Sequence, residues 1–236
     1  MPNNYYPVML DIRGRRAVVI GGDRVAGEKA AALSASGADV RIISPQFCDT
    51  ILQQAEHHQV TLVQKSYQSG DLAGAFVVIA ATNDPQLVQA IWNETQERGQ
   101  LVNIVDVPEH CSFIMPSILR REQLTIAVST EGASPSLAKR IRQNLEKQFP
   151  SAYGTYLRLA ALARTQLRQH GVSYEERDHF FEDYFTSPIL EYLVQGNLKQ
   201  AAIFTTALLQ NYAITIPATE LEVALERTIE GASDAL

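Results

Sequence analysis

The chain has 236 residues, of which 46% are hydrophobic and 19% are charged, and its formal net charge is −6. This composition is ordinary for a globular protein and argues against disorder, and the length allows one or two domains. The negative charge argues against sequence-independent binding to nucleic acid, which needs a clustered positive field.

The two cysteines, Cys48 and Cys111, stand far apart, and no CxxC motif occurs. This excludes a disulfide framework and a thiolate zinc site, and it fits a reducing compartment. The first residues lack the basic-then-apolar order of a signal peptide. The longest apolar run, around 73–81, is too short to cross a bilayer. We therefore expect a cytoplasmic protein with no membrane partner.

The first half of the chain alternates apolar, β-rich runs with helical patterns. Strands are predicted at 17–21, 39–44, 60–64, 76–81 and 101–105, and helices near 25–36, 47–57 and 85–98. The strands are apolar throughout, which indicates burial on both faces and hence a parallel sheet. The predicted fold is therefore α/β, a Rossmann-like doubly wound parallel sheet.

After residue 106 the pattern changes. A strand is predicted at 124–129, and a helix begins at Ser134, a good N-cap, with Pro135 in the first helical position. From 151 onward the strong patterns are helical, and the aromatic residues of this tail fall at a spacing typical of core packing. The expected domains are a Rossmann domain over 1–112, a connecting segment over 113–150 and a helical C-terminal domain over 151–236.

The turn after the first strand departs from the dinucleotide fingerprint. Gly21 can make the tight turn and Ala26 can allow close helix packing, but Asp23 stands where the second glycine belongs. A carboxylate about 4 Å from a pyrophosphate charge costs roughly 4 kcal/mol at an effective dielectric near 20. Arg24 could offset part of this repulsion, or Asp23 could turn away and cap the helix. The turn alone leaves cofactor binding open; its candidate residues are Gly21, Gly22, Asp23, Arg24, Val25 and Ala26.

Two further strand ends carry candidate cofactor contacts. Ser44 and Pro45 end the second strand, where an acidic residue would normally grip the ribose, so the choice between NAD and NADP stays open. Thr82 and Asn83 follow the fourth strand, at the edge where ligands of this architecture bind. The sequence TNDP is also typical of a helix cap.

The segment NIVDVPEHCSFIMPSI (103–118) is more distinctive. Together with VIGGDRVAGEKA, AATND and VSTEGASPSLAKRIR, it resembles the precorrin-2 dehydrogenase/sirohydrochlorin ferrochelatase family, the N-terminal module of siroheme synthase, here in a stand-alone form. The resemblance covers residues 1 to about 150 and continues more weakly into the helical tail. It implies NAD-dependent oxidation of precorrin-2 to sirohydrochlorin, and leaves open a second, lyase activity that inserts ferrous or cobalt ion. It also implies a homodimer, with 113–150 as the dimerisation segment.

The resemblance also assigns site residues. Asp106 matches the essential aspartate of the family, and Ser134 matches a serine that lines the tetrapyrrole site in some members. Lys139 and Arg142 could receive the carboxylates of the substrate, although a solvated helix face is the simpler interpretation. No metal ligands are expected, because no second histidine stands at ligand spacing from His110.

Asp23 is a departure from the family turn, which normally has three glycines. One alternative is therefore a chelatase that has lost the dehydrogenase step. Another is a nucleotide-sensing Rossmann regulatory module, although such modules usually keep the glycine turn and have no need of the 103–118 segment.

Overall fold

The computed structural model describes residues 5–233, with side chains through residue 225. The chain divides after Met115 into two compact units. This boundary lies near the predicted end of the Rossmann domain, and the division of the remainder into a dimerisation segment and a helical domain stays a prediction.

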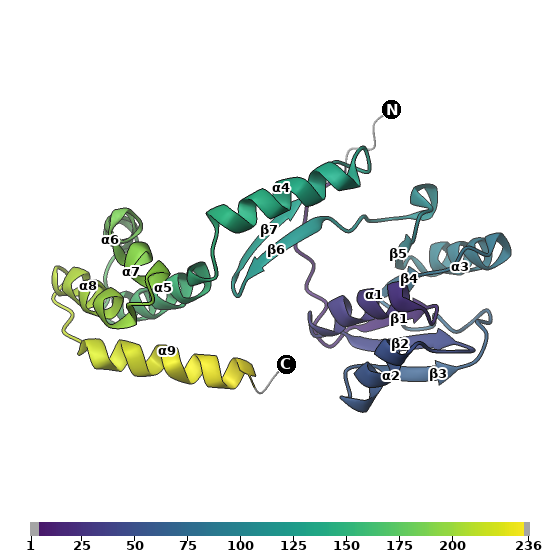
Figure 1. Ribbon diagram of the computed structural model, residues 1–236, viewed down its shortest axis with the longest axis horizontal. Helices are drawn as coiled ribbons and strands as arrows, with labels where there is room; N and C mark the ends of the chain where they lie inside the picture. Colours follow the sequence, from purple (N-terminus) through teal and green to yellow (C-terminus); the bar gives the residue numbers. More distant parts are fainter. Residues whose placement is uncertain (1–4, 234–236) are drawn as a thin grey trace. The chain divides into compact units, whose positions relative to one another are not determined.

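The first unit is built on one parallel sheet (Figure 1). Its strands are β1 (Arg16–Ile20), β2 (Asp39–Ser44), β3 (Thr61–Gln64), β4 (Val77–Ala80) and β5 (Leu101–Ile104). Their order across the sheet is β3-β2-β1-β4-β5, and every neighbouring pair is parallel. The predicted Rossmann-like fold is confirmed.

Both faces of this sheet are buried, as the continuous apolar strands predict. The helices are α1 (Arg24–Ser34), α2 (Asp49–Glu56), α3 (Pro85–Arg98) and the short 3-10 helix η1 (Pro108–His110). Val19 and Ile42 pack in the cluster that contains α1 and α2 residues, whereas their neighbours Val18 and Ile43 pack in the cluster that contains α3 residues. Each fully buried side chain of this size contributes about 1.5–3 kcal/mol to stability.

The second unit begins with an antiparallel hairpin of β6 (Ser117–Arg121) and β7 (Leu124–Val128), against which α4 (Pro135–Gln148) packs. The sequence predicted β7 and the start of α4 but not β6. Only Leu119 of β6 is fully buried, between exposed Ile118 and Arg120, so its apolar pattern is too short to detect.

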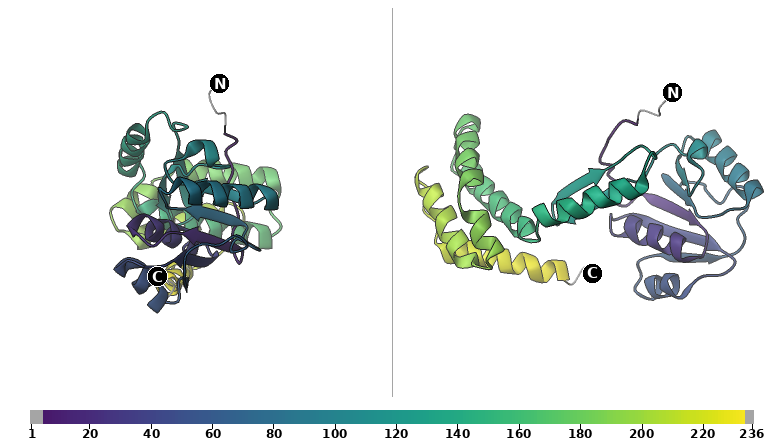
Figure 2. Two further views of the ribbon diagram at one scale, coloured as in Figure 1. Left: turned by 90° about the vertical axis from the view of Figure 1, so that its right-hand side faces the viewer. Right: turned by 45° about the horizontal axis from the view of Figure 1, so that its top comes forward.

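Helices form the rest of the second unit (Figure 2, green to yellow). They are α5 (Ala152–Gln169), α6 (Tyr174–Thr186), α7 (Ile189–Val194), α8 (Leu198–Gln210) and α9 (Ala218–Ser233). Tyr156 and Tyr184 stack with ring centroids 5.0 Å apart, and each hydroxyl donates to the other residue's carbonyl oxygen. The prediction that the tail aromatics pack in a core is confirmed for these two and for Phe180 and Phe181, whereas Phe185 is 53% exposed.

Within residues 5–233, no helix combines the length and the apolar character that crossing a bilayer requires.

Candidate active site at the carboxyl edge of the sheet

The turn between β1 and α1 excludes side chains at two adjacent positions. A Cβ on Gly21 would lie 2.6 Å from the carbonyl oxygen of Ala81, and φ of Gly21 is 132°. A Cβ on Gly22 would lie 1.8 Å from the carbonyl oxygen of Gln46. The fingerprint predicts the need for Gly21, but the close approach of the β2–α2 loop to Gly22 is a tertiary contact that the local sequence does not reveal.

Asp23 is the N-cap of α1. Its Oδ1 accepts a hydrogen bond of 2.9 Å from the backbone N–H of Ala26, and its φ of −87° carries no strain. The backbone therefore accommodates a side chain where the fingerprint expects glycine. Arg24 ion-pairs with Glu28, one turn along the helix, and makes no ion pair with Asp23. The negative charge of Asp23 consequently stays at the start of α1, where it offsets the positive end of the helix dipole.

The ends of β2 and β4 lie at the same edge as this turn, because all five strands are parallel. Ser44 is buried, and its Oγ accepts from the N–H of Gln46 at 3.5 Å. After β4, the Thr82 hydroxyl accepts from the N–H of Asp84 at 3.2 Å, and Asp84 caps α3 by accepting from Gln86 N–H at 2.9 Å. The helix-cap interpretation of this segment is confirmed. Asn83 is exposed beside the cap.

The end of β5 leads into a tight turn that holds Asp106. The N–H of Val107 donates to the carbonyl oxygen of Ile104 at 3.2 Å, and Asp106 has a φ of 61°. Left-handed backbone in a residue other than glycine is uncommon and concentrates at functional positions, although Asp and Asn tolerate it best. The Asp106 side chain is exposed to solvent at the carboxyl edge of the sheet.

Cys111 connects this turn to the strand before it. Its Sγ accepts from the N–H of Ile104 at 3.2 Å and lies 3.3 Å from the carbonyl oxygens of Ile104 and Val107. Burial raises the pKa of the thiol, so it stays protonated and can donate to one of these oxygens. The sequence suggests no such contact.

His110 packs against an aromatic ring instead of joining a metal site. Its ring centroid lies 5.1 Å from that of Trp92 on α3. Among residues 5–233, no cluster of three or more His, Cys, Asp or Glu side chains could hold a metal ion.

The three predicted substrate contacts belong to the second unit. Ser134 is the N-cap of α4, as predicted, and its Oγ accepts from Leu137 N–H at 3.3 Å. Arg142 ion-pairs with Glu146 on the same helix, whereas Lys139 is exposed. Substrate binding by these three residues stays a prediction.

Two family models match consecutive parts of the chain. The family described as "Putative NAD(P)-binding" matches residues 8–117. The family described as "Sirohaem biosynthesis protein central" matches residues 121–148. These two stretches contain the residues discussed above.

Similar full-length proteins and a solved structure agree with these matches. A siroheme synthase of Photorhabdus laumondii is 35% identical over 84% of this chain and 42% of its own length. One of Pseudomonas entomophila is 37% identical over 84% of this chain and 43% of its own length. The solved structure of SirC, precorrin-2 dehydrogenase, has a TM-score of 0.69 and 27% identity, and the match covers 84% of this chain and 98% of SirC. The chain thus spans less than half of the curated relatives and nearly all of SirC.

Proposed function

Because the chain belongs to the precorrin-2 dehydrogenase family, whose members include SirC and the N-terminal half of siroheme synthases, we propose that it catalyses NAD-dependent oxidation of precorrin-2 to sirohydrochlorin. One observation carries the proposal: Asp106 is held in the left-handed conformation at the sheet edge that also carries the glycine turn.

The residues at this edge fit a dinucleotide. Gly21 and Gly22 leave bare backbone where a pyrophosphate would approach α1, and buried Ala26 allows the helix to pack closely. Ser44 ends β2 on the side where the ribose would lie, and Pro45 follows it, with its carbonyl oxygen accepting from the Gln64 side-chain amide at 3.3 Å. Thr82 and Asn83 would contact the nicotinamide half. The negative charge of Asp23 would repel the pyrophosphate, but its side chain caps α1 and does not block the turn.

The proposed reaction removes a hydride and a proton from the reduced macrocycle. When bound, NAD supplies the hydride acceptor. The Asp106 carboxylate would accept the proton, and its exposure at the sheet edge leaves it accessible to a substrate. In the same proposal Ser134, Lys139 and Arg142 bind the tetrapyrrole, with the two cations paired to its carboxylates.

The test is an anaerobic assay that follows the precorrin-2 absorbance after NAD is added. We expect wild type to produce sirohydrochlorin and Asp106→Asn to lower kcat at least about 100-fold, as for loss of a general base. Asn tolerates the left-handed backbone, so the variant should keep its thermal midpoint. No product from wild type, or an unchanged rate for Asp106→Asn, would overturn the proposal.

We also propose metal insertion as a second activity, since the Asp106 carboxylate could take the protons that pyrrole nitrogens lose as ferrous or cobalt ion enters. Adding either ion to enzyme and sirohydrochlorin tests this against an enzyme-free control. If NAD does not bind at millimolar concentrations while chelation is accelerated, the chelatase alternative replaces the dehydrogenase.

The proposal includes a homodimer in the cytoplasm. Ile118 on β6 and Leu137 and Ile141 on α4 are 41%, 49% and 37% exposed, so the segment 113–150 offers apolar surface for a second copy. Light scattering coupled to size-exclusion chromatography should give twice the chain mass of 26.1 kDa. A monomer at micromolar concentration would contradict the dimer.

A further inference from the structure

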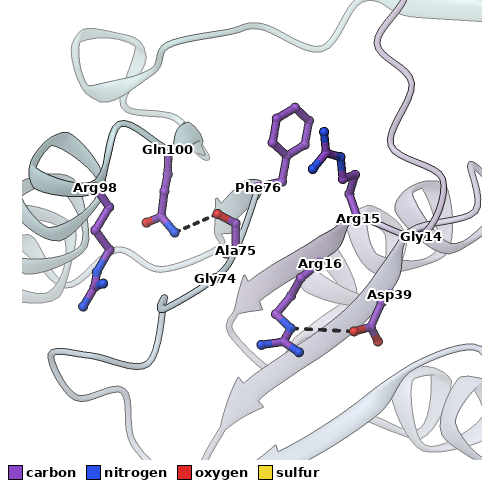
Figure 3. A pocket seen from close by; sticks show the side chains of 9 residues that line it. All are labelled: Gly14, Arg15, Arg16, Asp39, Gly74, Ala75, Phe76, Arg98 and Gln100. Carbon is purple, nitrogen blue, oxygen red and sulfur yellow. Dashed lines mark hydrogen bonds and ion pairs between the residues drawn. The ribbon is translucent and has the colours of Figure 1, made fainter.

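The first unit contains a cavity at the amino-terminal edge of its sheet, the end of the strands opposite to the glycine turn. Its volume is about 700 Å³. Figure 3 shows the side chains of Arg15 just before β1, Arg16 at its start and Asp39 at the start of β2. It also shows Arg98 at the end of α3 and Gln100 just before β5. Phe76, just before β4, also lines the cavity.

The cavity carries more positive than negative charge. Three guanidinium groups line it, and the one carboxylate of the lining is Asp39. The Asp39 Oδ2 lies 3.7 Å from the Arg16 Nε, too far for a hydrogen bond, and this buried Nε has no hydrogen-bond partner among the described residues. The Arg16 side chain as a whole is 37% exposed, so its terminal N–H groups, and not the buried Nε, can reach an anionic ligand.

Arg98 is only partly neutralised by its acidic neighbour. Its Nε donates to Glu94 Oε1 at 3.0 Å. The same carboxylate also accepts from the Tyr67 hydroxyl at 2.5 Å and from the N–H groups of Gly70 and Leu72. Glu94 is thus shared among four donors, and the remaining N–H groups of Arg98 have no hydrogen-bond acceptor among residues 5–233.

Arg15 adds a positioned cation. Its guanidinium carbon lies 4.9 Å from the centroid of the Phe76 ring, which holds it at the cavity wall. No carboxylate of the described residues lies within ion-pair distance of Arg15, and the Asp11 carboxylate, four residues earlier, already accepts two hydrogen bonds from the Arg13 guanidinium and one from the Arg13 N–H.

Gln100 holds part of the cavity wall beside these donors. Its amide nitrogen donates to the carbonyl oxygens of Leu72 and Ala75 at 2.6 and 2.8 Å, which fixes the orientation of the amide. The Oε1 is buried and not open to a ligand. The cavity therefore offers cationic donors against a wall that Gln100 holds in place.

We propose that this cavity binds a small oxyanion, such as inorganic phosphate or a polycarboxylate. The guanidinium groups of Arg15, Arg16 and Arg98, which line the cavity, bind the anion. In a protein of net charge −6, a local excess of arginine in a cavity is a selective feature and not part of a general basic surface. The proposal does not depend on the proposed dehydrogenase activity, because the glycine turn lies at the other edge of the sheet.

Calorimetric titration of the full chain with inorganic phosphate and with citrate, at constant ionic strength set by sodium chloride, tests the proposal. We expect saturable binding of at least one anion. Phosphate alone would identify a phosphorylated ligand, and citrate alone a polycarboxylate. Arg15→Gln and Arg16→Gln should each weaken binding about tenfold, as expected for loss of one charge-assisted contact.

Arg168→Gln is the matched control, since it removes one positive charge from an exposed position on α5 and should change affinity less than about twofold. Among the described residues the Arg15 side chain makes only the ring contact, so its variant should fold normally even if Arg16→Gln does not, and NAD binding should be unchanged in both. Absence of saturable binding by both anions, or an equal loss in Arg168→Gln, would overturn the proposal.

Discussion

Asp23 places a full negative charge on the first turn of α1, where a pyrophosphate would otherwise meet free N–H groups. The cap to Ala26 explains why the chain tolerates it: one helix donor is satisfied at no backbone cost. The same contact removes that donor from a ligand.

Asp23→Gly should therefore tighten NAD binding, by about fivefold to tenfold once solvent screening of an exposed charge is allowed for. Calorimetric titration with NAD measures the change. Asp23→Asn separates the two effects, because it keeps a capping oxygen and loses the charge. Equal affinities of wild type and both variants would mean that the carboxylate does not face the pyrophosphate.

Cys111 is expected to act on catalysis through the turn that presents Asp106. Cys111→Ala removes the contacts to Ile104 and Val107, and should destabilise the protein by about 1 kcal/mol and lower kcat several-fold with KM nearly unchanged. Cys111→Ser, which keeps a donor and an acceptor, should recover part of kcat.

The control is the same change in the Asp106→Asn background. If Cys111 acts by positioning Asp106, its removal there should cost stability without a further loss of kcat. An equal fractional loss of kcat in both backgrounds would assign Cys111 a purely structural role.

For single residues, the sequence predicted the structural roles that depend on local chain position and missed those that depend on contacts between distant segments. The cap at Ser134 is local and is confirmed. The requirement for Gly22 arises from Gln46, and the contacts of Cys111 arise from a folded turn, so neither leaves a periodic or compositional signal.

Among the elements, α3 does more than cover a face of the sheet. Through Glu94 it binds the loop before β4, by accepting from Tyr67, Gly70 and Leu72, and it pairs with its own Arg98. Burial alone would raise the pKa of Glu94. The hydrogen bonds lower it by more, so the pKa of Glu94 lies below its usual value of 4.5.

This shift predicts a pH-dependent stability. A carboxyl with a lowered folded-state pKa stabilises the protein above its unfolded value of 4.5, and the stabilisation is lost as the pH falls through the folded value. Glu94→Gln should cost about 1–3 kcal/mol at pH 7 and should lose less stability than wild type between pH 5 and pH 3. Urea denaturation at both pH values measures the difference, and parallel losses in the two proteins would contradict it.

The elements that the sequence predicted are those with a strong pattern. The strands β1, β2, β4 and β5 contain buried residues, edge strand β3 is half-buried at its two apolar residues, and all five were placed within a few residues of their observed bounds. β6 escaped prediction because its last two residues are Arg120 and Arg121, which leave only a short apolar stretch, and the partner of Arg121, the carbonyl oxygen of Phe149, is supplied only by the folded chain.

The whole molecule has a separate hydrophobic core for each unit. The sheet of the first unit divides its core into two clusters, and the helices of the second unit enclose another. A ligand that binds only at the carboxyl edge of the sheet should therefore stabilise the first unit and leave the second unit little changed.

Hydrogen exchange with and without NAD tests this at the scale of the chain. We expect slower exchange in 21–26, 44–48 and 82–84, and little change in the helices from 152 to 210. Asp23→Gly should show the same pattern at lower NAD concentration. Protection concentrated in the second unit would place the cofactor elsewhere.

The closeness of Gln46 to Gly22 also limits how this scaffold can be re-engineered. A variant library meant to change the preference for a phosphorylated nicotinamide cofactor has to leave position 22 fixed, since even alanine would bring its methyl carbon within 1.8 Å of a backbone oxygen. Substitutions are better introduced at position 46 and its neighbours, because their side chains can change while their backbone stays in place beside the turn.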